Sequence, residues 1–350
     1  MHLDSLKIQN FRLLEDIEVK KLGHVNLIVG KNNSGKSTVL EALALLASGF
    51  EVKTVKELNR FRSVDKYTVD YQEGFSDKLF SIETLLHSKS MSKNAYIGND
   101  SYHISFGYVI PELKKQFIGK YVYLLTDDSN GFPLQVSSNN ELITFKELKF
   151  GQTADIQYNF KLIDTNNINT EYLATIWDDT VLTADEDLII QMLNIIEPTI
   201  QDFAFLTSTD KKRVPFVRLI NAKGRVPLYD MGDGIFRLLQ IILKVLKARD
   251  GFLLIDEFEN GLHYSVQPDV WRLIFELSKR YNIQVFATTH SWDCIESFAQ
   301  VAKEREDLEG VLFRMGRSVR KSDNGKVIAT ELMKMSYTTS PKIRLRCASG

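Results

Sequence analysis

The feature that most constrains the fold of this chain is the glycine-rich segment GKNNSGKST, which occupies residues 30–38 at the end of the apolar run HVNLIVG. Glycines let the backbone turn tightly, so that successive N–H groups can point toward one anion. The apolar run predicts a buried strand, and STVLEALALLASG predicts a helix that ends at Gly49. The order of strand, glycine-rich loop and helix therefore indicates a phosphate-binding loop in an α/β fold.

The segment matches the pattern G-x-x-x-x-G-K-[ST] at Gly30, Gly35, Lys36 and Ser37. We expect Lys36 to reach the β- and γ-phosphates of a nucleotide, and we expect the Ser37 hydroxyl to bind Mg²⁺. The helix that begins near Lys36 points its positive end at the same place. The residues of this segment that we expect to contact ATP are Gly30, Asn32, Asn33, Ser34, Gly35, Lys36, Ser37 and Thr38. The alternative is a glycine turn without a ligand.

The composition of the 350 residues excludes several classes of protein. A hydrophobic content of 44% and a charged content of 25% are ordinary for a soluble globular protein, and a net charge of −1 gives no general attraction to nucleic acid or anionic membranes. The two cysteines, Cys294 and Cys347, are too few for a disulfide framework and too far from other soft ligands for a zinc site. Without a signal peptide or an apolar run of roughly 20 residues, the chain is expected to be cytoplasmic and to stay outside membranes.

The run FLLIDE places two carboxylates, Asp256 and Glu257, at the end of a predicted buried strand. A phosphate-binding loop needs a carboxylate at such a strand end for Mg²⁺, usually through water, and Asp256 suits that role. Glu257 is then free to orient and polarise an attacking water, which favours hydrolysis over transfer to a protein. The alternative is a strand that ends in solvated acids. Lys36 and Asp256 are 220 positions apart, so a large insertion separates the halves of the site.

Two further segments carry candidate phosphate contacts. VFATTHS ends the next predicted core strand with His290, which could hydrogen-bond the γ-phosphate; the alternative is an ordinary surface histidine. PLYDMGDGIF precedes a predicted amphipathic helix, and Gly232 and Gly234 would leave N–H groups exposed at its start, as in a second anion site. Because one cradle is already present, we expect this turn to cap a nucleotide held by another subunit, unless it is an ordinary glycine turn.

The pattern of predicted elements divides the chain into a discontinuous α/β head at residues 1–50 and 205–350 and an inserted α+β lobe at residues 51–204, with no long coiled coil. In the lobe, YHISFGYVI, KYVYLLT and TADIQYNFKLI predict strands, and DEDLIIQMLNIIEPTI predicts a helix. In the head, IFRLLQIILKVLKARDG and PDVWRLIFELSKR predict helices, whereas VLFRMG and GKVIATEL predict edge strands or a small cap.

As a set and in their order, these segments resemble the motifs of ATP-binding-cassette (ABC) type ATPase heads, and most closely those of the branch that contains OLD-family, RecF and SMC proteins. The shared segments are GKNNSGKS, MGDG, LLIDEFENGLH and TTHS, and the resemblance covers residues 1–48 and 205–315. IQNFRLLEDIEV also resembles the opening strands of that branch, which implies that Arg12 approaches the phosphates. The resemblance implies an α/β, ABC-type P-loop NTPase head with a mixed central sheet flanked by helices, an antiparallel β-subdomain and an inserted α+β lobe.

The resemblance also implies a homodimer, or a higher oligomer built from it, with two ATP molecules and Mg²⁺ between the subunits. Each nucleotide would contact the phosphate loop of one subunit and the signature-like turn of the other. The signature-like turn consists of Met231, Gly232, Asp233 and Gly234. The ENGLH loop, Glu259 to His263, is expected to cross between the subunits through Asn260, Gly261 and His263. Catalysis is assigned to Glu257 and His290, and metal binding to Ser37 and Asp256.

The chain departs from the family pattern at Asp230, where this branch commonly has a serine that contacts the γ-phosphate. A carboxylate would repel the phosphate unless Mg²⁺ or Arg237 lies between them, so either Asp230 points away or turnover is slow. The glutamine that couples the metal to the inserted lobe has several candidates, including Gln72 and Gln152, and none has a clear context.

OLD-family proteins often carry a Toprim nuclease after the ATPase, and no such module is expected here. About 60 residues follow His290, and they contain no Asp-x-Asp pair. Stand-alone AAA-family heads of this branch resemble components of bacterial anti-phage defence systems, so a separate effector, a nuclease or a toxin, is the expected partner. The protein would then act as a sensor or regulator for that effector.

Three other functions stay open. Nine basic residues lie between Arg314 and Arg346 against two acidic ones, Asp323 and Glu331, and they could bind DNA in a RecF-like repair ATPase; the alternative is a solvated basic face. Asp230 keeps open an ATP-dependent assembly switch with little turnover. A transporter energy subunit fits less well, because the signature-like turn is atypical and the opening strands fit the DNA-linked branch better.

Overall fold

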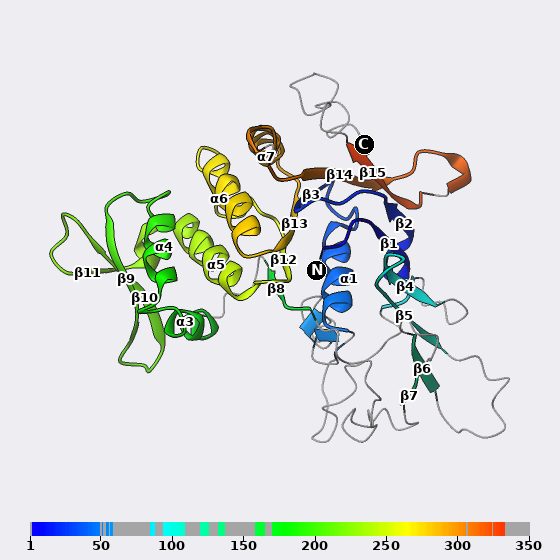
Figure 1. Ribbon diagram of the computed structural model, residues 1–350, viewed down its shortest axis with the longest axis horizontal. Coiled ribbons are helices and arrows are strands. Elements are labelled where there is room, and N and C mark those ends of the chain that lie inside the picture. The colour runs from blue at the N-terminus through cyan, green and yellow to red at the C-terminus, as the bar shows by residue number, and fades with distance from the viewer. Residues whose placement is uncertain are drawn as a thin grey trace, which may run out of the picture.

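The computed structural model shows a central sheet flanked by helices, together with two antiparallel sheets (Figure 1). The part of the chain that the structure describes comprises residues 2–49, 51, 54–55, 57–58, 85–87, 94–108, 120–125, 132–136, 158–164, 170–305, 307–323 and 325–332. Within these ranges, no helix has the length and apolar character needed to cross a lipid bilayer.

Six strands form the central sheet in the order β15-β14-β3-β13-β12-β8. Their bounds are β3 Val25–Val29, β8 Phe160–Ile163, β12 Phe252–Ile255, β13 Gln284–Thr289, β14 Gly310–Arg317 and β15 Val327–Leu332. Neighbouring strands run parallel except β14 and β15, which are antiparallel. Every residue of β3, β12 and β13 is buried, which explains why the sequences of these strands are largely apolar rather than alternating.

Helices cover both faces of this sheet (Figure 1). One face packs against α1 (Lys36–Ala47), and the other packs against α5 (Asp233–Lys247), α6 (Gln267–Arg280) and α7 (Trp292–Glu304). Alternation along β3 divides the core: Leu27 and Val29 pack with α5, α6 and α7, whereas Ile28 packs with α1. Because β3, β13 and β12 run parallel, their carboxyl ends emerge at one edge of the sheet, where ligands bind in open α/β folds.

An antiparallel sheet in the order β2-β1-β4-β5-β6-β7 shares a second core with α1. Its strands are β1 Leu6–Phe11, β2 Leu14–Val19, β4 Ala95–Gly98, β5 His103–Tyr108, β6 Lys120–Leu125 and β7 Phe132–Val136. Leu6, Ile8 and Ile17 are buried in that core, whereas Lys7 and Glu18 are exposed. This sheet is the predicted antiparallel subdomain, and with the mixed central sheet it confirms the expected fold class.

Strands from the segment expected to form an inserted lobe join both of these sheets. β4 pairs with β1, and β8 pairs with β12 at the edge of the central sheet. The predicted strands YHISFGYVI and KYVYLLT contain β5 and β6, and TADIQYNFKLI contains β8, although residues 153–157 of that run lie outside the described part. The division of the chain at residues 50 and 205 stays a prediction.

A three-stranded antiparallel sheet in the order β11-β10-β9 packs with α3 and α4 beside α5. These elements are α3 Thr170–Asp178, α4 Ala184–Leu193, β9 Ile200–Thr207, β10 Arg213–Leu219 and β11 Arg225–Pro227. Trp177 of α3 and Phe203 of β9 meet edge to face, with their ring centroids 4.7 Å apart. The helix expected to run to Ile200 ends at Leu193 and is followed by a turn, and Pro198 disfavours a helical conformation at Glu197 beyond it.

Candidate active site

The phosphate loop connects β3 to α1, as the sequence predicted. Gly35 caps the start of α1 with a φ of 94°, in the left-handed region that favours glycine. A Cβ atom at this position would lie 2.9 Å from Cδ2 of Leu14, so the loop also passes close to β2. Ser34 and Thr38 are buried, whereas Asn32, Asn33 and Ser37 are exposed. The three exposed side chains are those that a ligand could contact directly.

Lys36 is held at the loop by hydrogen bonds within it. Its Nζ donates to the carbonyl oxygens of Gly30, at 2.8 Å, and Lys31, at 3.0 Å. Burial lowers the pKa of the ammonium group, and the negative charges of Asp256, Glu259 and Glu257 oppose that shift. The Lys36 ammonium, which faces these three carboxylates, is thus already positioned at the loop.

Asp256 lies next to the serine of the phosphate loop. The Ser37 hydroxyl donates to Oδ1 of Asp256 at 3.1 Å, although the two residues are 219 positions apart in the chain. A hydroxyl and a carboxylate oxygen in contact are the hard ligands that Mg²⁺ prefers, so the side chains present fit this ion. Within the described residues there is no group of three or more His, Cys, Asp and Glu side chains that could hold a metal ion.

Thr288 was not among the residues predicted from the sequence, and it joins the two acidic positions. Its hydroxyl donates to Oδ1 of Asp256 at 2.5 Å and accepts the Glu257 backbone N–H at 2.9 Å. Thr288 is completely buried on β13. A buried hydroxyl after the apolar run VFA, next to TH in the segment ATTHS, is the signal in the sequence that could have indicated this contact.

Glu257 has a φ of 47°, in the left-handed region that residues other than glycine seldom adopt. Its N–H is bound by Thr288, and its carbonyl oxygen accepts from Nη2 of Arg237 at 3.1 Å. The backbone of the proposed general base is therefore bound on both sides of its Cα. Such outliers persist where the surrounding structure holds them, often at functional sites.

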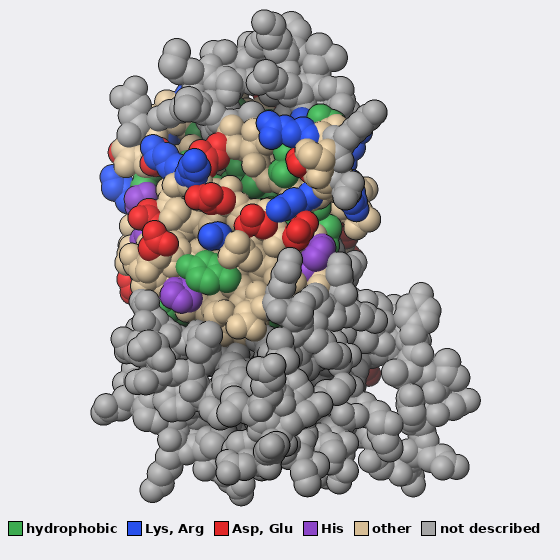
Figure 2. All heavy atoms as spheres, turned by 90° about the vertical axis from the view of Figure 1, so that its right-hand side faces the viewer, with side chains coloured by type: hydrophobic (Ala, Val, Ile, Leu, Met, Phe, Trp, Pro, Cys, Tyr) green, Lys and Arg blue, Asp and Glu red, His purple; other side chains and the backbone are tan. Residues whose placement is uncertain are grey.

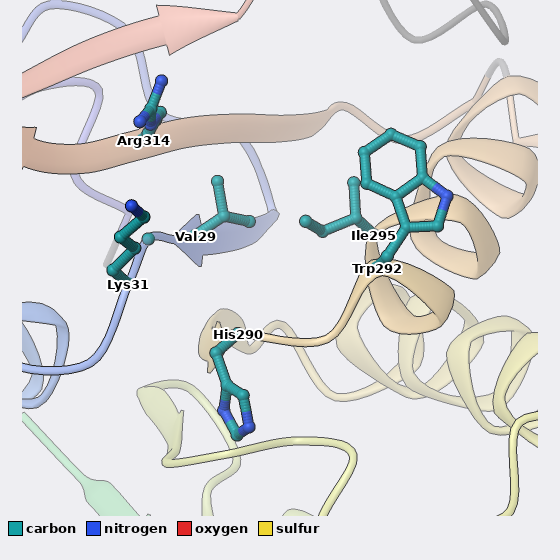
Figure 3. A pocket seen from close by; sticks show the side chains of 7 residues that line it. Val29, Lys31, His290, Trp292, Ile295 and Arg314 are labelled. Carbon is teal, nitrogen blue, oxygen red and sulfur yellow. The ribbon is translucent and has the colours of Figure 1, made fainter. Parts of the chain in front are cut away.

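His290 lies beside Glu259, which the sequence analysis placed in the ENGLH loop without expecting this contact. Its Nδ1 is 3.2 Å from Oε1 of Glu259, and the same oxygen accepts the backbone N–H groups of His290, at 3.1 Å, and Ser291, at 3.2 Å. Figure 3 shows the imidazole directed away from Lys31 and Arg314. The proposed contact of His290 with a γ-phosphate stays a prediction, and Glu259 is the residue that orients this histidine in the structure.

A pocket of about 120 Å³ opens beside the phosphate loop (Figure 3). The residues that line it come from the carboxyl ends of β3 and β13, from the interior of β14 and from the start of α7; they are Val29, Gly30, Lys31, His290, Trp292, Ile295 and Arg314. The pocket combines two cationic side chains with apolar ones, and it adjoins the carbonyls of Gly30 and Lys31 that Lys36 binds.

The signature-like turn lies at the start of α5. Gly232 precedes the helix with a φ of 92°, Met231 is half-buried, and Asp233 is exposed. A Cβ atom on Gly234 would lie 2.7 Å from the carbonyl oxygen of Gly261, so the turn packs directly against the ENGLH loop. In that loop, Asn260 and His263 are exposed.

Asp230 is exposed, and Arg237 does not lie between it and the site. Arg237 points into the protein, where it donates to the carbonyl oxygens of Asp256, Glu257 and Asp164. The sequence suggested Arg237 as a possible screen for Asp230, and the hydrogen bonds correct that suggestion. The candidate coupling residues Gln72 and Gln152 lie outside the described residues.

Arg12 is buried between β1 and α1. Its Nε is 3.3 Å from Oε2 of Glu41 on α1, and its carbonyl oxygen is 2.8 Å from Nδ1 of His87. The φ of Arg12 is 48°, so this residue too has a left-handed backbone. The structure therefore shows Arg12 joined to the helix that follows the phosphate loop, and its proposed approach to phosphate stays a prediction.

A phosphate loop between a central parallel strand and a helix, with a distant strand-end carboxylate against its serine, is the arrangement of P-loop NTPases. The chain belongs to the family described as “AAA domain, putative AbiEii toxin, Type IV TA system”, which matches residues 25–293. That range contains the phosphate loop, the signature-like turn, the acidic strand end and His290.

Relatives in sequence agree with this placement. A Helicobacter pylori protein named “ATP/GTP phosphatase” is 25% identical over 344 residues, which is 87% of this chain and 89% of that protein. The DNA replication and repair protein RecF of Clostridioides difficile is 39% identical over 69 residues, which is 19% of each chain. The predicted resemblance to ABC-type heads of the RecF and SMC branch is therefore confirmed.

Solved structures support the fold. The SmcHead bound to the C-winged helix domain of ScpA superposes with a TM-score of 0.54 at 16% identity, over 95% of this chain and 98% of that one. The Smc head domain of Pyrococcus furiosus, bound to the C-terminal domain of ScpA, gives a TM-score of 0.50 at 13% identity, over 99% and 98%. At such identities the likeness concerns the fold alone.

Proposed function

We propose that this protein binds ATP with Mg²⁺ at its phosphate loop, hydrolyses it as a head-to-head dimer, and thereby regulates a separate effector in bacterial anti-phage defence. The observation that carries the ATPase proposal is the 3.1 Å contact between the Ser37 hydroxyl and Asp256. It joins the two halves of a magnesium–triphosphate site from segments that lie far apart in the chain. The relative named “ATP/GTP phosphatase”, which matches over most of both chains, supports hydrolysis.

In this proposal, the exposed loop and the start of α1 bind the triphosphate. Lys36 would exchange its two carbonyl partners for phosphate oxygens, and the N–H groups at the start of α1 would face the same anion. Ser37 and Asp256 would hold Mg²⁺, which neutralises charge on the phosphates during hydrolysis. Thr288 keeps Asp256 in place through the hydrogen bond to Oδ1.

Glu257 would orient the attacking water and accept its proton. The side chain follows directly after the metal-binding Asp256 and is half-buried, so it reaches the site and remains open to water. His290 would contact the γ-phosphate after leaving Glu259, since its imidazole is exposed and near the mouth of the pocket. The phosphate loop, Glu257 and His290 follow the ends of β3, β12 and β13, which are neighbours in one sheet.

Dimerisation would bring the signature-like turn of one subunit to the phosphates bound by the other. Gly232 and Asp233 are exposed at the start of α5, where backbone N–H groups favour an anion. Asp230, also exposed, can turn toward solvent, which removes its repulsion from the phosphate. The SMC heads with this fold were solved with domains of a separate protein, ScpA, which supports the idea that such a head acts through a partner.

The ATPase proposal is tested with Glu257→Gln in the purified full-length chain. We expect the variant to bind ATP, to dimerise more stably and to lose hydrolysis by about 100-fold or more, because the base is gone while the binding groups remain. Released phosphate, nucleotide affinity and light scattering are the measurements, each with Mg²⁺ and with EDTA. Glu276→Gln on the exposed face of α6 is the control. Normal turnover in Glu257→Gln would contradict the assignment.

The effector is tested by purifying the protein from its native host at native levels. Recovery of a nuclease or toxin together with the protein, identified by mass spectrometry, is the expected result. A protein that is recovered alone would count against a dedicated effector.

Direct DNA binding is the second candidate, and the match to RecF favours it. Against it, Lys326 lies 3.6 Å from Asp16, Arg317 donates to the Gly325 carbonyl, and the face in Figure 2 mixes acidic with basic side chains. DNA that stimulates ATP hydrolysis at low salt, with binding that weakens steeply as salt rises, would favour this candidate. An ATP-dependent assembly switch would instead show dimerisation with negligible phosphate release.

A further inference from the structure

Arg237 is a buried cation whose contacts lead directly to the proposed catalytic residues. It is 5% exposed, and it lies on α5 one turn after the signature-like turn. Its Nη2 donates to the carbonyl oxygens of Asp256, at 2.7 Å, and Glu257, at 3.1 Å. Its Nη1 donates to the carbonyl oxygen of Asp164, at 2.9 Å, and to Oε1 of Gln240, at 3.0 Å.

These partners distinguish Arg237 from an ordinary buried ion pair. The guanidinium binds the main chain of Asp256 and Glu257, and so it leaves both carboxylates free to meet other groups. Nη2 reaches the two successive carbonyl oxygens while Nη1 reaches Asp164 and Gln240, and these four acceptors exceed the three donors of a lysine ammonium. Because burying a charge without a carboxylate in direct contact is costly, a role beyond packing is a reasonable explanation for this residue.

The main chain that Arg237 binds is the strained one. Glu257 has a φ of 47°, and its N–H is already held by Thr288. Arg237 supplies the second constraint, at the carbonyl oxygen of the same residue. Without it, the peptide after Glu257 is free to relax toward an ordinary backbone conformation, which would redirect the carboxylate.

The same arginine belongs to the helix that carries the signature-like turn. α5 is continuous from Asp233 to Lys247, so a movement of its first turn is transmitted to Arg237. The ENGLH loop closes the connection, because Gly261 lies between Gly234 and Arg237: its carbonyl oxygen would touch a Cβ on Gly234, and its own Cβ position is 3.6 Å from Cβ of Arg237.

We propose that Arg237 is a positioning residue that holds the Asp256–Glu257 main chain in its catalytic conformation and couples that conformation to the signature-like turn. When a second copy of the protein contacts the turn of one chain, it would change the position of Glu257 in that same chain. This inference rests on the proposed ATPase function, and it adds a route by which the two sites of a dimer communicate.

The chain offers a matched control in Lys244, two turns further along α5. It is also a buried cation, 9% exposed, and its Nζ also donates to a main-chain carbonyl, that of Leu162 at 2.7 Å. Leu162 lies in β8 and is not part of the site. Loss of a buried cation from α5 is therefore common to Arg237→Met and Lys244→Met, whereas contact with Asp256 and Glu257 is lost only in the first.

The test compares Arg237→Met, Arg237→Lys and Lys244→Met in the full chain by kcat, KM, ATP affinity and thermal unfolding. For both Arg237 variants we expect kcat to fall about 10- to 100-fold with ATP affinity changed less than about threefold, because binding groups stay while the base is misplaced. For Lys244→Met we expect kcat within about twofold of the wild type, with a comparable loss of stability. Arg237→Lys keeps the positive charge, so it replaces Arg237→Met in the test if that variant does not fold.

Two results would overturn the inference. Unchanged kcat in a folded Arg237 variant would show that the main-chain contact does not position Glu257. Equal losses of kcat in the Arg237 and Lys244 variants would show a general effect of destabilising α5. Failure of the proposed function is separate and visible in the wild type, which would then release no phosphate, and the inference would fall with it.

Discussion

The phosphate loop and the signature-like turn differ in how many of their polar groups have partners within one chain. At the phosphate loop, Lys36 has two carbonyl partners and Ser37 contacts Asp256. At the turn, Asp230 and Asp233 are exposed, and no described atom lies within 4 Å of a Cβ placed on Gly232. One half of the proposed site is therefore assembled inside a single chain. The other half exposes its backbone groups, as expected of a surface that a second molecule contacts.

Lys36→Ala should have the largest effect on the assembled half. Removing the ammonium removes a cation that faces Asp256, Glu257 and Glu259, so the phosphates would meet less compensated negative charge. We expect ATP affinity, measured by calorimetry, to fall by about 100-fold or more. Lys303→Ala, at an exposed position on α7, is the control and should bind ATP nearly normally. Similar affinities for the two variants would contradict the comparison.

Gly234→Ala tests the outward half. The added methyl would stand 2.7 Å from the Gly261 carbonyl oxygen, so the turn and the ENGLH loop must separate. We expect hydrolysis to fall about 10-fold or more while ATP still binds, because the phosphate loop is untouched. Gly316→Ala is the control, since no described atom lies within 4 Å of its Cβ position. If ATP binding is lost together with turnover, the two regions are not separable in this way.

Glu259→Gln tests a junction between the two regions. The amide keeps an oxygen for the N–H groups of His290 and Ser291 but loses the charge that attracts the imidazole. We expect kcat to rise by about three- to tenfold, with the protein still folded, because His290 then leaves Glu259 more easily to contact the γ-phosphate. Turnover is again measured as released phosphate, and a change as large as that of Glu257→Gln would indicate that Glu259 itself acts in catalysis.

The smallest expected effect concerns α5, which connects the two regions. Burial lowers the pKa of Lys244 to about 8 from 10.5 in the unfolded chain. Between these values the unfolded chain binds more protons than the native one, so the free energy of unfolding should rise with pH, by about 1 kcal/mol or more from pH 8 to 9.5. Urea unfolding of the wild type and Lys244→Met checks this. The rise should be absent in the variant, and identical slopes would contradict it.

The parts of the site that were predictable from the sequence are those whose residue types and local order carry the chemistry. GKNNSGKST and FLLIDE each contain a strand end and the side chains that follow it, so Lys36, Ser37 and Asp256 could be named without coordinates. Their contact then follows from two parallel strands that end at one edge of the sheet. Local sequence was sufficient because the fold brings strand ends together in a regular way.

The contacts that escaped prediction depend on the main chain or on distant partners. Arg237 and Glu259 bind backbone carbonyl and N–H groups, which every residue has and which no pattern of side chains marks. The same reason applies to β4 and β8, whose pairing with β1 and β12 depends on which strand edges are free in the assembled sheet. Pro198, in contrast, is a local signal, and it could have been used to end the predicted helix before Glu197.

The position of β3 in the central sheet has a consequence for biosynthesis. β3 lies between β13 and β14, and neither of these strands begins before residue 284. A ribosome makes β3 and the phosphate loop long before β13 and β14, and the strand gains both neighbours only after Arg317 has been added. Until then the N–H and C=O groups along its edges have no partner in the sheet, a condition that exposes a nascent chain to aggregation. The first part of the nucleotide site to be synthesised is thus among the last to be fixed in place.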